Sequence, residues 1–283
     1  MMESQNKSIL IVAAVIVILL LGAGVLYWQY TRPPAVPPTV EPPKAETPSQ
    51  PPPGAEVKVA EEKEVPPQPE VKLPALDQSD DFVRQMLKNL SPHGKLGEWL
   101  KIKNIIRVFV AAVDNIANGK SPRPQLGFLS PGQAFQVNEK GERIYLDPKG
   151  YGRFDIITDA FVSFSSSRAV QVYQKLRPLF QEAYRELGYP QKDFHSTFIQ
   201  AMNKILDAPI VEREILLKEE GKGLNYIFID DGMESMNGVQ KHLLRMGPKN
   251  TQKIQQKVRE IALALGVPET QLPQPQIYIP RGR

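Results

Sequence analysis

Lysine side chains recur at every fourth position near the C-terminal end of the chain, at Lys249, Lys253 and Lys257. This spacing places them on one face of an α-helix whose opposite face is apolar. Arg245 precedes the row across a Gly–Pro turn. Such a row could bind an anionic lipid surface, cell-wall carboxylates or an acidic protein. We therefore predict a binding site at Arg245, Lys249, Lys253 and Lys257, with a solvated helix face as the alternative.

A second candidate binding surface lies in "AYRELGYP" and comprises Arg185 and Tyr189. Arginine and tyrosine are among the residues that dominate binding hot spots. Packing of the neighbouring Tyr184 in the protein core is the alternative explanation for this pattern.

No motif for catalysis or metal binding occurs in the sequence. The three histidines, His93, His195 and His242, are isolated from one another. The chain has no cysteine, which excludes thiol nucleophiles and cysteine–zinc sites. We expect no cofactor and no metal site, and the catalytic residues, if there are any, are unknown.

Two clusters of acidic residues could either bind a cation or have a structural role. Both precede predicted helices, where carboxylates cap the helix and interact favourably with its dipole. The second group also lacks the ligand spacing of a calcium loop. We expect both to initiate helices: Asp77, Asp80 and Asp81, and Asp230, Asp231 and Glu234.

The charge of the chain is nearly balanced, with 35 Lys and Arg against 31 Asp and Glu, and the basic residues are scattered. Nucleic-acid binding usually requires basic residues concentrated on one face. We therefore expect no nucleic-acid partner.

Hydrophobic periodicity from Leu76 onward predicts a mainly α domain of about seven helices with one or two small β-hairpins, covering residues 76–267. Helical spacing predicts helices that begin near Asp80 and cover about 103–117, 151–164, 167–187, 194–206, 233–246 and 249–265. Pro178 lies inside the fourth of these, so we expect a kink or two abutting helices there. Alternation with period two predicts hairpins within 133–148 and 213–229. Residues 268–283 are expected to form a flexible C-terminal tail.

A run of 20 residues without charge, 9–28, follows a short tail of residues 1–8. Its helical length of about 30 Å matches the hydrocarbon core of a bilayer. Tyr27, Trp28 and Tyr30 lie at its end, where aromatic rings favour the membrane interface. We predict one transmembrane helix that contacts the lipid bilayer through 9–28. A cleaved signal peptide is the alternative, since "GAG" at 22–24 resembles a cleavage site.

Residues 29–75 form a proline-rich linker, in which 14 of the 43 residues from Pro33 to Ala75 are proline. Proline lacks an N–H and fixes φ, so this segment favours polyproline II over helix or sheet. We predict a disordered spacer that holds the domain away from the membrane. The order of anchor, spacer and domain resembles that of the energy-coupling protein TonB, in architecture alone.

Several segments resemble a bacterial family known as domain of unknown function 3014, and the resemblance covers about 73–265. They are "LPALDQSDDFVRQML", "FVAAVDNIANGK", "YGRFD", "VYQKLRPLFQEAYRELGYP" and "HLLRMGPKN". Members typically carry the same anchor and spacer. The resemblance supports these boundaries and implies no catalytic residue.

Two functional hypotheses remain open. The first is a membrane-tethered interaction or scaffold module of the bacterial inner membrane, single-pass, with its domain in the periplasm and another envelope component as its partner. The second is an envelope hydrolase that acts through a carboxylate pair, which the sequence does not identify. The charge flanking residues 9–28 is nearly symmetric, so a cytoplasmic domain is also considered. The oligomeric state is unknown.

Overall fold

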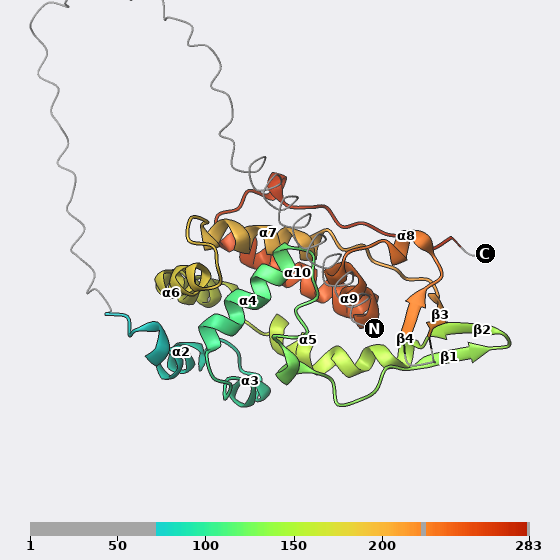
Figure 1. Cartoon of the computed structure of the whole chain (residues 1–283), viewed down its shortest axis with the longest axis horizontal. Helices are drawn as coiled ribbons and strands as arrows, with labels where there is room; N and C mark the ends of the chain where they lie inside the picture. The colour runs from blue at the N-terminus through green and yellow to red at the C-terminus, as the bar shows by residue number, and fades with distance from the viewer. Residues whose placement is uncertain (1–71, 222–224, 282–283) are drawn as a thin grey trace, which may run out of the picture. The chain divides into compact units, whose positions relative to one another are not determined.

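A computed structural model describes residues 72–221 and 225–281, and Figure 1 shows the arrangement of their helices and strands. The predicted N-terminal tail, the predicted membrane span at 9–28 and most of the predicted linker lie outside these residues. Among the helices that the structure describes, none has the length and hydrophobicity needed to span a membrane.

The described part of the chain is mainly helical, as predicted. Its α-helices are α2 (Asp80–Leu87), α3 (Lys95–Trp99), α4 (Ile105–Ala117), α5 (Asp155–Val162), α6 (Ser166–Glu186), α7 (Phe194–Leu206), α8 (Asp231–Glu234), α9 (Gly238–Met246) and α10 (Pro248–Ala264). Its strands are β1 (Val137–Lys140), β2 (Arg143–Leu146), β3 (Leu216–Glu220) and β4 (Asn225–Phe228). Short 3₁₀-helices also occur, among them η1 (Leu76–Gln78), η3 (Pro148–Phe154) and η4 (Glu269–Gln271).

The helix predicted over 233–246 is divided in two. Asn237 begins α9 as its N-cap and accepts hydrogen bonds from the backbone N–H groups of Val239 and Gln240. The Gln240 side chain accepts in return from the Asn237 backbone N–H, which completes a capping box. The sequence analysis also missed α3. In contrast, α6 runs through Pro178 as one helix, so two abutting helices were the wrong expectation there.

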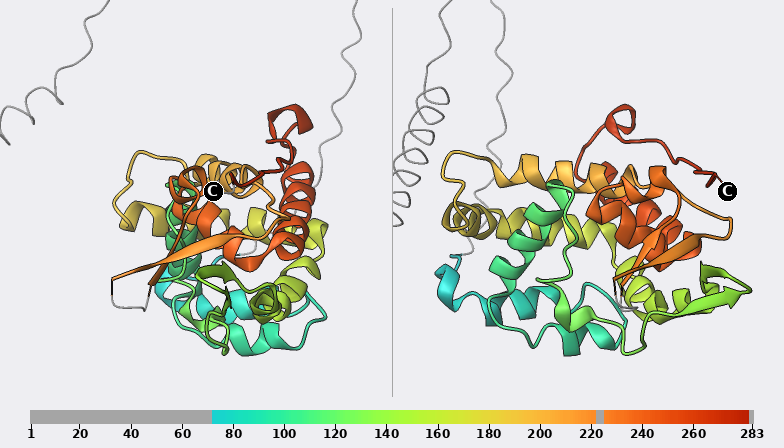
Figure 2. Two further views of the ribbon diagram at one scale, coloured as in Figure 1. Left: turned by 90° about the vertical axis from the view of Figure 1, so that its right-hand side faces the viewer. Right: turned by 45° about the vertical axis from the view of Figure 1, so that its right-hand side comes forward.

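The two predicted hairpins are present, and they join into one antiparallel sheet of order β1-β2-β3-β4. The joining pairs are Ile144 with Leu217 and Tyr145 with Leu216. One face of the sheet buries Leu146, Leu217 and Phe228 in a cluster with α8 and α9. Figure 2 shows the β1–β2 hairpin projecting beyond the helices.

The helical part is built around α4 and α10. Helix α4 packs against α6 and α7, and α10 packs against α5, α6 and α7. Apolar residues at helical spacing on α4, including Ile106, Val110 and Val113, are buried. The sheet lies at the opposite end of this helical body from α2 and α3 (Figure 1).

The segment after Pro268 lies against the domain. Leu272 is buried in a cluster with residues of α7 and α10. Ile277 forms a parallel bridge with Ile210, and the Tyr278 hydroxyl donates a hydrogen bond of 2.6 Å to Asp230. Figure 2 shows the segment crossing the same side of the domain as α7. This packing was not anticipated by the prediction of a flexible tail.

Candidate anion-binding site

Glycine allows the loop after α4 to approach the start of α9. A Cβ on Gly238 would lie 2.9 Å from the backbone nitrogen of Ser121, which is closer than a real side chain allows. Gly119 has a φ of +70° and accepts a hydrogen bond from the Val239 backbone N–H. The loop therefore carries Ser121 and Arg123 to the side of α9.

Three arginines meet in this region: Arg123 from the loop, Arg153 from η3 and Arg245 from α9. We call them the arginine cluster. Burial lowers the pKa of Arg153, and the charges of Arg123 and Arg245 lower it further. Burial also lowers the pKa of Arg245, which the charge of Glu234 raises and that of Arg123 lowers. Burial is the largest cause for both residues. Arg153 and Arg245 are half-buried, whereas Arg123 is exposed.

Aromatic rings and backbone carbonyls, rather than carboxylates, position the buried members of the arginine cluster. The Arg153 guanidinium carbon lies 4.7 Å from the Phe154 ring centroid and 5.2 Å from that of Phe135. Arg245 donates to the backbone carbonyls of Lys241 and Tyr226. No member pairs with a carboxylate within 72–221 and 225–281. The Nε of Arg153 is buried, and in the described part of the chain it has no acceptor.

His242 lies beside the arginine cluster on α9. Burial lowers its pKa to about 4, and the charges of Arg123, Arg245 and Arg153 act in the same direction. Its Nδ1 is 3.5 Å from the Ser121 hydroxyl. At neutral pH the imidazole is therefore uncharged, with one nitrogen able to donate a hydrogen bond and the other to accept one.

The arginine cluster borders a cavity of about 1210 Å³. Besides the cluster, the charged residues that line the cavity are Lys241 and Glu220. Lys241 is already paired with Glu234, and Glu220 is exposed at the end of β3. The remaining wall is mostly apolar and comes from α2, α4, α5, α6, α7 and α10. The site therefore combines guanidinium groups that form no ion pair within the described residues with a mostly apolar interior.

Guanidinium groups bind phosphate and carboxylate oxygens through paired hydrogen bonds. An anion at the arginine cluster would relieve the mutual repulsion of its members. Elsewhere in the described segments, no group of three or more His, Asp or Glu side chains is arranged to hold a metal ion. The arrangement is therefore suited to binding an anion.

Comparison with known proteins places the chain in a family. Residues 105–262, more than half of the chain, match the family described as Protein of unknown function (DUF3014). The chain belongs to this family. No curated protein and no solved structure matches it. The part that matches DUF3014 contains the whole arginine cluster and His242, whereas α2 and α3 lie outside it.

Of the binding residues predicted from the sequence of this DUF3014 protein, Arg245 belongs to the arginine cluster. Lys249, Lys253 and Lys257 lie on α10. Lys249 is exposed, but Lys253 forms an ion pair of 2.8 Å with Asp159, and Lys257 pairs with Glu260. The row therefore presents less free positive charge than its spacing indicated, and its role in binding stays a prediction.

Arg185 and Tyr189 lie at the end of α6 and in the turn after it. Tyr189 is half-buried and stacks on Tyr184, with 4.7 Å between ring centroids, and Lys192 lies 4.5 Å from the Tyr189 ring centroid. Arg185 is exposed. Neither residue lines the cavity.

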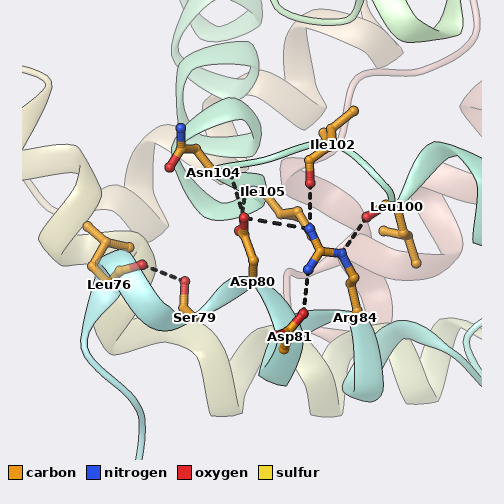
Figure 3. A network of polar contacts seen from close by, with 9 residues as sticks. All are labelled: Leu76, Ser79, Asp80, Asp81, Arg84, Leu100, Ile102, Asn104 and Ile105. Carbon is orange, nitrogen blue, oxygen red and sulfur yellow. Dashed lines mark hydrogen bonds and ion pairs between the residues drawn. The ribbon is translucent and has the colours of Figure 1, made fainter.

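In the first acidic group, Asp80 and Asp81 lie in the first turn of α2, as expected, but they also make contacts that were not predicted (Figure 3). The Asp80 carboxylate accepts from the backbone N–H groups of Asn104 and Ile105, so it caps α4 rather than its own helix. Asp81 pairs with Arg84, and Asp77 pairs with Arg107. In the second group, Asp230 caps α8 through the backbone N–H of Met233, as expected.

Sequence reasoning missed Arg123 and Arg153. A weak signal was available, because neither has an Asp or Glu three or four positions away that could pair with it on a helix. Arg168 shares this feature without belonging to the arginine cluster. This signal alone could therefore not have identified the members of the arginine cluster.

Proposed function

We propose that the protein is a membrane-tethered binding module of the bacterial cell envelope, and that the arginine cluster receives an anionic group of the component that it binds. In this proposal, residues 9–28 anchor the chain in the inner membrane and the domain lies in the periplasm. The support for the anchor is the uncharged run of 20 residues followed by a proline-rich spacer. Alkaline phosphatase fused to the C-terminus should be active in this topology and inactive if the domain is cytoplasmic.

The observation that carries the binding proposal is that no member of the arginine cluster forms an ion pair with a carboxylate among the described residues. Surface arginines usually have solvent or an acid as partner, and a buried guanidinium is costly unless it is paired. Arg153 is partly buried among two other arginines, and its Nε has no acceptor within the described residues. An anionic ligand would supply this missing partner.

The alternative of an envelope hydrolase has less support. A glycosidase mechanism requires two carboxyl groups that face each other across the substrate. Among the described residues that line the cavity, Glu220 is the one carboxylate. Binding is therefore the function that the geometry supports best.

Titration of the full chain, purified in a non-ionic detergent, with inorganic phosphate tests the proposal. We expect saturable binding that weakens about tenfold or more in Arg153→Gln and in Arg245→Gln, because each loses a charge-assisted hydrogen-bond donor. Isothermal titration calorimetry measures the dissociation constant.

Arg177→Gln is the matched control. Arg177 is an exposed arginine of α6 that does not line the cavity. Its replacement should leave phosphate binding unchanged. If the unmodified protein binds no phosphate, or if all three variants bind it equally, the arginine cluster is not an anion site.

A further inference from the structure

Charge and apolar surface are segregated along the cavity. The charged lining residues come from the loop after α4, η3, α9 and the β3–β4 hairpin. The wall formed by α4, α5, α6 and α10 has no charged side chain among its described residues; it is lined by Phe109, Ile157, Phe161, Leu176, Ile261 and other apolar groups. A ligand that fills the space must therefore be anionic at one end and apolar along the rest.

Part of the wall of the apolar space is closely packed. Some residues on its wall, such as Val83 and Ile106, are only 1% and 2% exposed, whereas Ile157, Phe161 and Ile261 are half-buried. The volume of about 1210 Å³ is therefore bordered both by closely packed and by half-buried side chains from several helices. Its size also exceeds the roughly 300–1,000 Å³ of most small-molecule pockets. A long, thin and flexible ligand fits this shape better than a compact one does.

We propose that the ligand of this domain is an anionic lipid whose headgroup phosphate binds the arginine cluster and whose acyl chain extends between α4, α5 and α10. This inference rests on the proposed function, since it identifies the chemical class of the anion bound there. The headgroup is recognised by guanidinium hydrogen bonds, and the chain adds affinity because each methylene leaves water for apolar surroundings. The buried hydroxyl of Thr158 also lies on a residue that lines this wall, and it has no hydrogen-bond partner in the described segments.

The test uses the full chain in nanodiscs of phosphatidylcholine and compares three probes. Glycerol 3-phosphate carries the headgroup alone, and long-chain lysophosphatidic acid carries the headgroup and one acyl chain. Lysophosphatidylcholine carries the same chain on a zwitterionic headgroup. Both lipids have a diazirine at the end of the chain, so that light attaches the chain to the peptides that it contacts, which mass spectrometry then identifies.

We expect lysophosphatidic acid to label peptides of α4, α5 and α10 and to bind about tenfold or more tightly than glycerol 3-phosphate does, because only the lipid fills the apolar space. Lysophosphatidylcholine should label these helices far less. The variant Ile157→Trp, which fills the space from α5, should reduce the labelling and leave binding of glycerol 3-phosphate unchanged.

The outcomes separate the two proposals. If glycerol 3-phosphate binds through the arginine cluster but the lipid labels only residues 9–28, the anion site stands and the lipid inference is wrong. Equal labelling by the two lipids would show that the anionic headgroup is not recognised. If glycerol 3-phosphate and inorganic phosphate both fail to bind, the proposed function itself fails. Because labelling of the unmodified protein is informative, the test does not depend on correct folding of Ile157→Trp.

Discussion

Two arginines of this protein show how the neighbours of a charged side chain determine its role. Arg107 lies between Asp77 and Glu186, whose hydrogen bonds raise its pKa, and it links η1, α4 and α6. Arg153 instead lies beside two other arginines, and its pKa is lowered by burial and by their charges. The first side chain links elements of the fold, whereas the second forms no ion pair among the described residues, which is why we propose an external partner for it.

The buried His242 predicts a pH dependence of stability. Its pKa is about 4 in the folded protein, compared with 6.5 for a histidine whose pKa is not shifted by the fold. As the pH falls from about 6.5 to about 4, the unfolded chain takes up a proton at His242 while the folded chain does not. The free energy of unfolding should therefore decrease over this window, by an amount on the order of 2 kcal/mol at about pH 5.

Urea unfolding at neutral pH and at about pH 5 measures this effect. The variant His242→Gln stays neutral throughout, so its stability should fall less between the two conditions than that of the unmodified protein. If the unmodified protein and His242→Gln lose the same free energy of unfolding between the two pH values, His242 does not cause the pH dependence.

The start of α4 depends on a residue from another element. Asn104, the N-cap position, has a φ of +57°, and its own side chain makes no capping hydrogen bond. The Asp80 carboxylate replaces that cap from α2, accepting hydrogen bonds of 2.8 and 2.9 Å from the backbone N–H groups of Asn104 and Ile105 (Figure 3). Because α4 precedes the loop that carries Arg123, this cap also supports the candidate site.

We predict that Asp80→Ala lowers the free energy of unfolding by about 1–2 kcal/mol, because it leaves two backbone N–H groups of α4 without their acceptor. Asp81→Ala is the control, since Asp81 is adjacent, also pairs with Arg84 and has a side chain that is 98% exposed. Its effect should stay within about 0.5 kcal/mol. Chemical denaturation measures the free energy of unfolding of both variants. Equal losses in Asp80→Ala and Asp81→Ala would contradict the capping role of Asp80.

The C-terminal segment runs from α7 and α10 to the start of α8. Leu272 packs near α7 and α10, and Tyr278 reaches Asp230 at the start of α8. Asp230 also accepts a hydrogen bond from the backbone N–H of Arg281. The segment lies outside the part that matches DUF3014, but it covers apolar surface of helices that lie inside it. The folded domain therefore extends beyond the boundary at residue 267 that periodicity indicated.

Replacing Leu272 tests whether this segment stabilises the whole domain. Leu272 is 4% exposed, so Leu272→Ala should lower the free energy of unfolding by about 2–4 kcal/mol through lost burial and the cavity that remains. Ile279 lies in the same segment and is 59% exposed, so Ile279→Ala should change the free energy of unfolding by no more than about 0.5 kcal/mol. Thermal or urea unfolding distinguishes the two, and a stable Leu272→Ala protein would argue that the segment is only loosely attached.

Local patterns in the sequence were sufficient to locate most of the helices and both hairpins. Helix α7 covers Phe194–Leu206, the range that apolar periodicity predicted, and both hairpins lie within the predicted segments. These features depend on residues within a few positions of one another, so their causes are visible in the sequence. The family was likewise recognisable from the order and spacing of its motifs.

The tertiary structure decided which charges are compensated. Asp80 caps a helix 24 residues away, and Asp159 pairs with Lys253 from 94 residues away. The arginine cluster gathers residues from three separate segments, of which only Arg245 was predicted to bind. Local spacing in the sequence does not determine whether a charge is paired in the fold, because Coulomb energy depends on distance in space and on burial.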